Sequence, residues 1–162
     1  GSEMCIRDRL KAFRPLVTDN LLKAGNTLTQ RCFRTNKNEV IVKMNIEGMV
    51  DGQKAGLCHY SKSYAMVGVR QSGKDRNLEF QTNKEKITGP AIKGNKVWIK
   101  SVWGLDGKSQ FSYSTDGRKF TPFGEVYQLE WGYYRGSRIG IYCFNNIADA
   151  GYIDVDEFIY LY

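Results

Sequence analysis

Apolar side chains recur at every second position along most of this chain, which is the pattern of β-strands that bury one face. The clearest run is Val40–Ile46, in which every even-numbered residue is apolar while the odd-numbered positions include Lys43 and Asn45. Comparable runs lie at residues 54–60, 64–71, 76–81, 96–103, 109–114, 138–144 and 151–161. This periodicity favours strands over helices through most of the sequence.

Short turn-forming sequences separate these runs. They are built from Gly, Asp, Asn and Ser, the residues that most readily adopt the backbone angles of tight turns. We expect turns at residues 51–52, 72–74, 94–95, 106–107, 116–117 and 145–146. Strands about ten residues apart with such turns between them predict an all-β sandwich or barrel.

The 162 residues suffice for one ordinary domain with its own core. Residues 1–2 are typical of a cloning remnant, and residues 3–9 resemble the translation of a sequencing adapter that is sometimes left in assembled metagenomic genes. We therefore treat residues 1–9 as a tag or assembly artefact and predict a single β-sandwich over residues 10–162. A short helix is considered only for residues 9–23, where Pro15 would interrupt it.

The net charge is positive, because 24 Lys and Arg residues face 17 Asp and Glu residues, which gives +7. The basic residues are spread along the chain and form no nucleic-acid recognition motif, so we expect no nucleic-acid partner. We also expect no membrane partner, because no apolar run is long enough to span a bilayer. A +7 surface would suit the uronic-acid substituents of an acidic polysaccharide.

The cysteines and the single histidine show no metal-site or nucleophile pattern. Cys5, Cys32, Cys58 and Cys143 lie far apart without a CxxC pair, so we expect buried free thiols. Cys58 and His59 cannot act as a dyad, because neighbours on a strand point to opposite faces. His59 is therefore either a packed polar residue or a hydrogen-bonding group on a binding face.

Asp154 and Asp156 form the only carboxylate pair on one predicted strand face. At strand rise their Cα atoms lie roughly 6.5–7 Å apart, a separation compatible with a glycosidase pair. Alternation with Ile153 and Val155 instead favours the solvated face of a strand. A structural calcium site completed from elsewhere is a further hypothesis, and we expect no cofactor to be required.

Aromatic residues accumulate in the second half of the chain. A sugar site needs aromatic platforms beside planar polar groups, because sugars present flat C–H faces edged with hydroxyls. Residues 129–136 have this makeup in a predicted loop, whose alternative role is a hydrophobic plug at one end of the sandwich. Alternation places Trp98 on the same face as Lys100, which is typical of a partly open surface.

Four segments carry a resemblance to a known family, namely GQKAGLCHYSKSYAMVGV, FSYSTDGRKFTPFGE, WGYYRGSRIGIYCFN and AGYIDVDEFIYLY. Together they resemble the C-terminal concanavalin-A-like module attached to family-43 glycoside hydrolases, a group that includes β-xylosidases and α-L-arabinofuranosidases. The resemblance covers about residues 26–162. It implies a jelly-roll sandwich of two curved antiparallel sheets with an accessory function.

The resemblance implies a non-catalytic carbohydrate-binding module, secreted or periplasmic with its bacterial parent enzyme. The expected partners are the family-43 catalytic domain of the parent chain and plant cell-wall polysaccharide, namely xylan or arabinoxylan. The alternative is a structural accessory domain that docks on and completes the catalytic domain without binding sugar. A third hypothesis, residual hydrolase activity, would require Asp154 and Asp156.

Eleven residues are candidate sugar contacts, although they cannot all share one face. The loop aromatics and Trp98 rank first, followed by His59 and Arg70. The full set is Trp98, Trp131, Tyr133, Tyr134, Arg135, His59, Arg70, Gln71, Trp103, Tyr64 and Tyr142.

Overall fold

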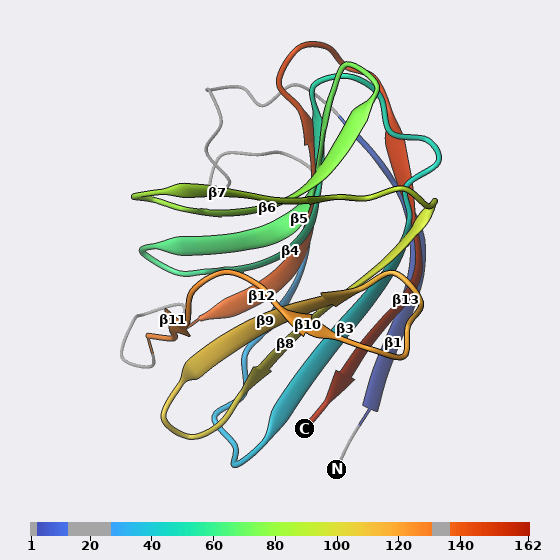
Figure 1. The fold of residues 1–162 in the computed structure, drawn as a ribbon. Coiled ribbons are helices and arrows are strands. Elements are labelled where there is room, and N and C mark those ends of the chain that lie inside the picture. The colour runs from blue at the N-terminus through green and yellow to red at the C-terminus, as the bar shows by residue number, and fades with distance from the viewer. Residues whose placement is uncertain (1–2, 13–26, 131–136) are drawn as a thin grey trace.

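Two antiparallel β-sheets make up the computed structural model, which describes residues 3–12, 27–130 and 137–162 (Figure 1). One sheet has the order β1-β13-β3-β8-β9-β10, with β11 beside β9; the other has the order β2-β12-β4-β5-β6-β7. The first comprises β1 (Glu3–Lys11), β13 (Tyr152–Leu161), β3 (Asn38–Asn45), β8 (Lys96–Trp103), β9 (Lys108–Ser114), β10 (Thr121–Pro122) and β11 (Tyr127–Gln128). The second comprises β2 (Thr27–Arg31), β12 (Arg138–Asn145), β4 (Gln53–Tyr60), β5 (Tyr64–Ser72), β6 (Asp75–Thr82) and β7 (Lys86–Ala91).

The predicted all-β sandwich is confirmed. All eight strands expected from the alternation are present, as β3, β4, β5, β6, β8, β9, β12 and β13. The helix considered for residues 9–23 is wrong at its start, because residues 9–11 continue strand β1; residues 13–23 lie outside the described part of the chain. The described residues contain no helix, and thus none long and apolar enough to cross a membrane.

Residues 3–9, which we left out of the fold prediction, form most of strand β1 through antiparallel pairing with β13. Main-chain pairing of this kind does not depend on where those residues come from. Leu10, just after them, belongs to the core and is only 4% exposed. The sheet therefore continues past the boundary that the sequence alone suggested.

One apolar layer lies between the two sheets. On β3 the alternation is strict, and Val40, Val42 and Met44 are completely buried. Burying each such side chain contributes about 1.5–3 kcal/mol relative to leaving it in water. On β4, in contrast, nearly every side chain is buried, so both of its faces are covered.

A β-bulge in β13 shifts the alternation of inward and outward side chains by one residue. Val155 pairs with Met44 and Glu157 pairs with Lys43, so Asp156 is an extra residue. The extra residue shifts the phase by one, and both Val155 and Phe158 consequently face the core at 2% and 3% exposure. Without this bulge, the residues after Val155 would turn the wrong side chains inward.

The turn at Asn145 joins the ends of β4, β12 and β13. The Asn145 amide donates to the carbonyls of Asp51 and Ala150, both at 3.0 Å. Its side-chain oxygen accepts from the backbone N–H groups of Ile147 and Ala148, at 2.8 and 3.0 Å. This fully buried side chain therefore fixes two turns against each other.

Two glycines make room for a tyrosine on the outer face of the six-stranded sheet. Gly56 of β4 pairs with Gly68 of β5, and Tyr142 of β12 pairs with Gly56. A Cβ atom on Gly56 would lie 2.8 Å from the Tyr142 hydroxyl, and one on Gly68 would clash with the same hydroxyl and with the Ala55 carbonyl. The Tyr142 side chain therefore reaches from β12 over β4 and β5.

We expect Gly68→Ala to lower the free energy of unfolding by about 2–3 kcal/mol, because the added methyl meets backbone as well as Tyr142. Gly94→Ala is the matched control, since the nearest atom to its Cβ is 4.0 Å away. It should change stability by less than about 0.5 kcal/mol. Urea unfolding of both variants measures the difference, and equal stabilities would contradict the packing described for Tyr142.

Candidate functional site

The predicted sugar contacts lie in several separate places. Trp131, Tyr133, Tyr134 and Arg135 lie outside the described residues. His59 and Trp103 are in the layer between the sheets, and Trp98 is on the outer face of the seven-stranded sheet. Tyr64, Arg70 and Tyr142 share the outer face of the six-stranded sheet. Among the described residues, this is the only outer sheet face that carries more than one predicted contact.

Polar side chains from four neighbouring strands, β12, β4, β5 and β6, lie on that outer face, which we call the polar face. Lys54 Nζ lies 3.0 Å from Glu79 Oε1 and donates to Gln81 Oε1 at 3.0 Å. The side chains of Lys54 and Glu79 are only 4% and 7% exposed. The polar face consists of Lys54, Tyr64, Arg70, Glu79, Gln81 and Tyr142.

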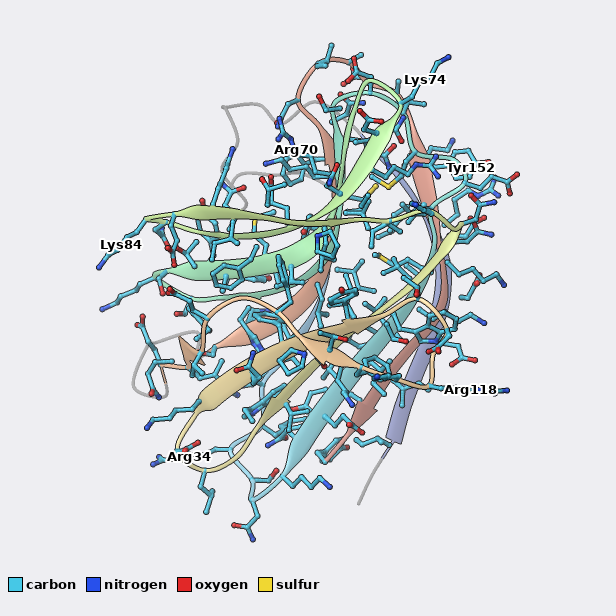
Figure 2. All side chains as sticks on the ribbon, in the orientation of Figure 1. Arg34, Arg70, Lys74, Lys84, Arg118 and Tyr152 are labelled. Carbon is cyan, nitrogen blue, oxygen red and sulfur yellow. The ribbon has the colours of Figure 1, made fainter. Side chains whose placement is uncertain are left out.

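Arg70 extends this network toward solvent. Its Nε lies 3.9 Å from the second oxygen of Glu79, and 49% of its side chain is exposed. Figure 2 shows Arg70 beside β5, on the side of the strand that faces away from the seven-stranded sheet. On the opposite side of the network, Gln81 Nε2 donates to the Tyr64 hydroxyl at 3.4 Å.

The polar face can offer directed hydrogen bonds but little aromatic surface. Tyr142 and Tyr64 are 3% and 7% exposed, so their rings present almost no area on which a sugar could stack. Glu79 is held between two cations, so both of its carboxylate oxygens already have partners within the protein. Directed contacts through Arg70 are what this arrangement supports best.

Sequence reasoning missed Lys54, Glu79 and Gln81. A signal for two of them exists in β6, where Glu79 and Gln81 alternate with the buried residues Leu78 and Phe80. Polar residues at alternate positions of a strand share the face opposite the core. The burial of these side chains cannot be read from that alternation, because it depends on neighbouring strands.

His59 is a packed polar residue of the core, as one of the two hypotheses stated, and not a group on a binding face. It is completely buried, with Nε2 2.7 Å from Ser101 Oγ and Nδ1 3.5 Å from Cys32 Sγ. Its ring is surrounded by the rings of Trp103, Phe111 and Tyr127 at centroid distances of 5.1, 5.5 and 5.8 Å. Burial lowers the pKa of His59 to about 3.

Trp103 is also placed where a polysaccharide does not reach, which corrects its selection as a contact. It is 2% exposed, and its indole N–H donates to the Phe33 carbonyl at 3.1 Å. Trp103 has the same parity along β8 as the buried residues Val97 and Ile99. That shared parity is the signal that would have assigned it to the core.

Gln71 lies at the end of β5, where the adjoining turn uses both ends of its amide. Its Nε2 donates to the Gly73 carbonyl at 2.9 Å, and its Oε1 accepts from Arg76 Nε at 2.9 Å. The side chain is 8% exposed. Gln71 therefore orders the turn and contributes little to the polar face.

Trp98 is half-buried, as its pairing with Lys100 on one face predicted. A Cβ atom on Gly117, whose φ is +76°, would lie 2.8 Å from the Trp98 ring, so the turn at Asp116-Gly117 lies against the indole. Lys43 Nζ lies 5.3 Å from the ring centroid. Part of this ring is thus already covered by the protein itself.

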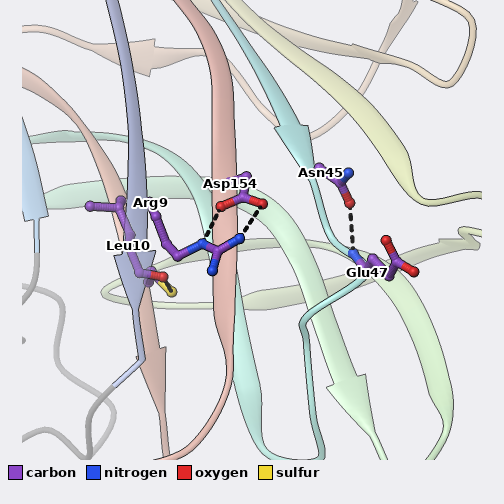
Figure 3. Close-up of polar contacts among 6 residues, drawn as sticks. Arg9, Leu10, Asn45, Glu47 and Asp154 are labelled. Carbon is purple, nitrogen blue, oxygen red and sulfur yellow. Dashed lines mark hydrogen bonds and ion pairs between the residues drawn. The ribbon is translucent and has the colours of Figure 1, made fainter.

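Each carboxylate of the β13 pair lies beside a basic side chain of the protein. Asp154 accepts two hydrogen bonds from Arg9, at 2.6 and 3.1 Å, which Figure 3 shows as a forked pair. These bonds lower the pKa of Asp154, whereas a catalytic acid would need a raised pKa. Asp156 lies 3.8 Å from Lys96 Nζ. The described residues contain no group of three or more His, Cys, Asp or Glu that could hold a metal ion; calcium binding stays a prediction.

The prediction of buried free thiols is confirmed for Cys32, Cys58 and Cys143. Burial raises the pKa of all three, that of Cys143 to about 12. Thiols with such pKa values remain protonated near neutral pH and are poor nucleophiles. The side chain of Cys5 lies outside the described part of the structure.

Residues 9–161 match the family described as the β-xylosidase C-terminal concanavalin A-like domain. A β-xylosidase of Formosa agariphila is 33% identical over 142 residues, which cover 86% of this chain and 24% of that protein. The chain thus spans about a quarter of that curated relative.

Solved structures show the same fold. A bifunctional GH43-CE protein of Bacteroides eggerthii superposes with a TM-score of 0.83 at 24% identity, covering 94% of this chain and 21% of that one. A GH43 protein of Bacillus licheniformis gives a TM-score of 0.77 at 18% identity, covering 96% and 32%. In both, the matched region is a minor part of a longer chain.

The buried His59 predicts a loss of stability in mild acid. The folded state keeps the ring neutral down to about pH 3, whereas the unfolded chain takes up a proton below about pH 6.5. Acidification below pH 6.5 therefore favours unfolding, by up to about 1.4 kcal/mol per pH unit.

We expect His59→Gln to have a shallower pH dependence between pH 6.5 and 5, a range in which most carboxylates remain ionised. The measurement is urea unfolding at several pH values for both proteins. The variant is expected to be less stable at pH 7, so the comparison concerns the slopes. Identical slopes would show that His59 does not govern the acid response.

Proposed function

Because this chain belongs to the family of β-xylosidase C-terminal concanavalin A-like domains, we propose that it docks on the catalytic part of a family-43 glycoside hydrolase. In this function it acts as a non-catalytic accessory domain that completes the enzyme by packing against it. The hydrolytic carboxylates then belong to the catalytic part, and the sandwich supplies a rigid surface.

The coverage of aromatic side chains is the observation that carries this proposal. Tyr142, Tyr64 and Trp103 are 3%, 7% and 2% exposed, and the turn at Gly117 covers part of Trp98. A polysaccharide-binding module depends on open aromatic platforms, and the described candidates do not provide them. The length of the β-xylosidase relative is a second support, since about three quarters of it lies outside the match.

Removing the domain from the hydrolase that carries it should impair the enzyme on every substrate. We expect kcat/KM to fall by a similar factor, about tenfold or more, for a small aryl xyloside and for xylan. The melting temperature of the remaining part should fall by about 5 °C or more, because a packed surface becomes exposed.

The two kinetic measurements separate docking from substrate capture. A loss confined to xylan, with aryl xyloside hydrolysis intact, would indicate that the domain binds polysaccharide instead. Unchanged activity on both substrates together with an unchanged melting temperature would overturn the docking function.

The second candidate function is binding of xylan or arabinoxylan on the polar face. The observation that favours it is the buried network of Lys54, Glu79 and Gln81, which lies beside the half-exposed Arg70 and holds it through Glu79. Sugar hydroxyls are the ligands that such planar and charged groups recognise. A uronic-acid substituent would add an ion pair with Arg70.

Affinity electrophoresis of the isolated chain in gels with xylan, arabinoxylan, β-glucan or no polysaccharide tests this candidate. A sugar site on the polar face predicts that xylans retard the chain and that Arg70→Ala removes most of the retardation. Lys84→Ala is the matched control, because it removes an exposed cation from the turn after β6. Equal mobility in every gel would eliminate the polar face as a xylan site and leave the docking function.

A further inference from the structure

The C-terminal half of the outer edge of β13 is covered by residues that do not belong to the family match. Strand β1 pairs with β13 from Glu3 opposite Leu161 to Lys11 opposite Tyr152, whereas the match begins at residue 9. We infer that the edge of β13 over residues 156–161 is a strand-acceptor site. In the hydrolase, it is filled by the extended segment that joins the catalytic part to this domain.

Contacts made from residue 9 onward fix the register of β1. Arg9 binds Asp154 through two hydrogen bonds and lies 4.3 Å over the Tyr152 ring. Leu10 is 4% exposed in the core, and the Ala12 N–H donates to the Gly151 carbonyl at 2.8 Å. A strand held in this way at residues 9–12 directs the residues before it along the edge of β13.

Before residue 9, the pairing crosses the bulge and continues to the end of β13. Ile6 lies opposite Phe158 and Asp8 lies opposite Val155, so the register shifts between them and then resumes. Ladder hydrogen bonds join main-chain groups, which every residue except proline can supply. The acceptor edge therefore selects for an extended backbone and not for a particular sequence.

An uncovered edge would be a liability for this domain. β13 has ten residues, and without a neighbour its outer N–H and C=O groups would be open to pairing with other chains. A segment of the same polypeptide is the most available occupant, because its effective concentration is high. The family is described as a C-terminal domain and the β-xylosidase relative has about three quarters of its length outside the match, so we expect the catalytic part and a joining segment to precede this domain.

The direction of the pairing has a consequence for the enzyme. β1 runs antiparallel to β13, so the chain enters beside Leu161, and Figure 1 shows both termini at the same end of the sandwich. A joining segment held as a strand positions the catalytic part at that end, whereas a flexible linker would not. The identification of the joining segment as the occupant rests on the proposed function. The existence of an acceptor edge on β13 does not depend on that function.

Hydrogen exchange of the 162-residue chain tests the acceptor edge through two variants. In one, residues 3–8 are present in shuffled order; in the other, Cys5→Pro and Ile6→Pro remove adjacent N–H groups from β1. We expect the shuffled chain to keep the protection of the β13 amides that face β1. The double proline variant should exchange these amides roughly tenfold faster or more, with the amides between β3 and β8 unchanged.

Each outcome decides a separate point. Loss of protection in the shuffled chain would show that specific side chains are required, and unchanged exchange in the proline variant would show that the edge is not filled by pairing. Either result alone would overturn the inference.

The same proline pair placed before the residue equivalent to Arg9 in the full hydrolase tests the occupant. Faster β13 exchange is expected there, and unchanged exchange would exclude the joining segment as occupant. Docking can fail independently of this result, because it is measured by the melting temperature and activity after removal of the whole domain.

Discussion

The large apolar layer between the two sheets is the constraint on which the rest of this structure depends. Each strand must place alternate side chains in that layer, and an error of one residue would turn a whole strand inside out. In β13 the extra residue Asp156 lets both Val155 and Phe158 face inward. Before the bulge, ordinary alternation between the buried Ile153 and Val155 leaves Asp154 outside, where Arg9 binds it and aligns β1. The inward alternation of β13 thus also positions the carboxylate that holds the first strand.

Much of the fold could be predicted because most strands bury one face. Residues 40–46 and 96–103 lie in strands whose burial alternates as predicted, although Trp103 was selected as a surface contact and is buried. β7 was missed because it is an exposed edge strand with Gly89 and Pro90, which carry no alternating signal. β1 was missed for a different reason, since its first residues pair through the main chain and have no pattern of their own.

The candidate site was predicted less completely, since alternation assigns residues to a face without saying which face is the core. β4 is buried on both sides, so its sequence does not show whether His59 or its neighbour Cys58 faces the core. Tyr64, Arg70 and Tyr142 were selected for their chemistry, and the sheet order brings them to one face. Lys54 and Glu79 are two strands apart, and only the pairing of β4, β5 and β6 shows that their side chains meet.

The buried ion pair on the polar face bears on how the domain acts. Moving Lys54 and Glu79 out of water costs several kcal/mol per ion, and their attraction offsets this only with further polar partners. Gln81 accepts a hydrogen bond from Lys54, and Arg70 lies 3.9 Å from Glu79 as a second cation. Apolar residues of similar volume would often be at least as stable, so stability alone does not explain the pair. A surface that only filled space against a partner could be apolar. A fixed set of charged and polar groups around Arg70 would orient a partner that contacts this face, which is what the two proposed functions require.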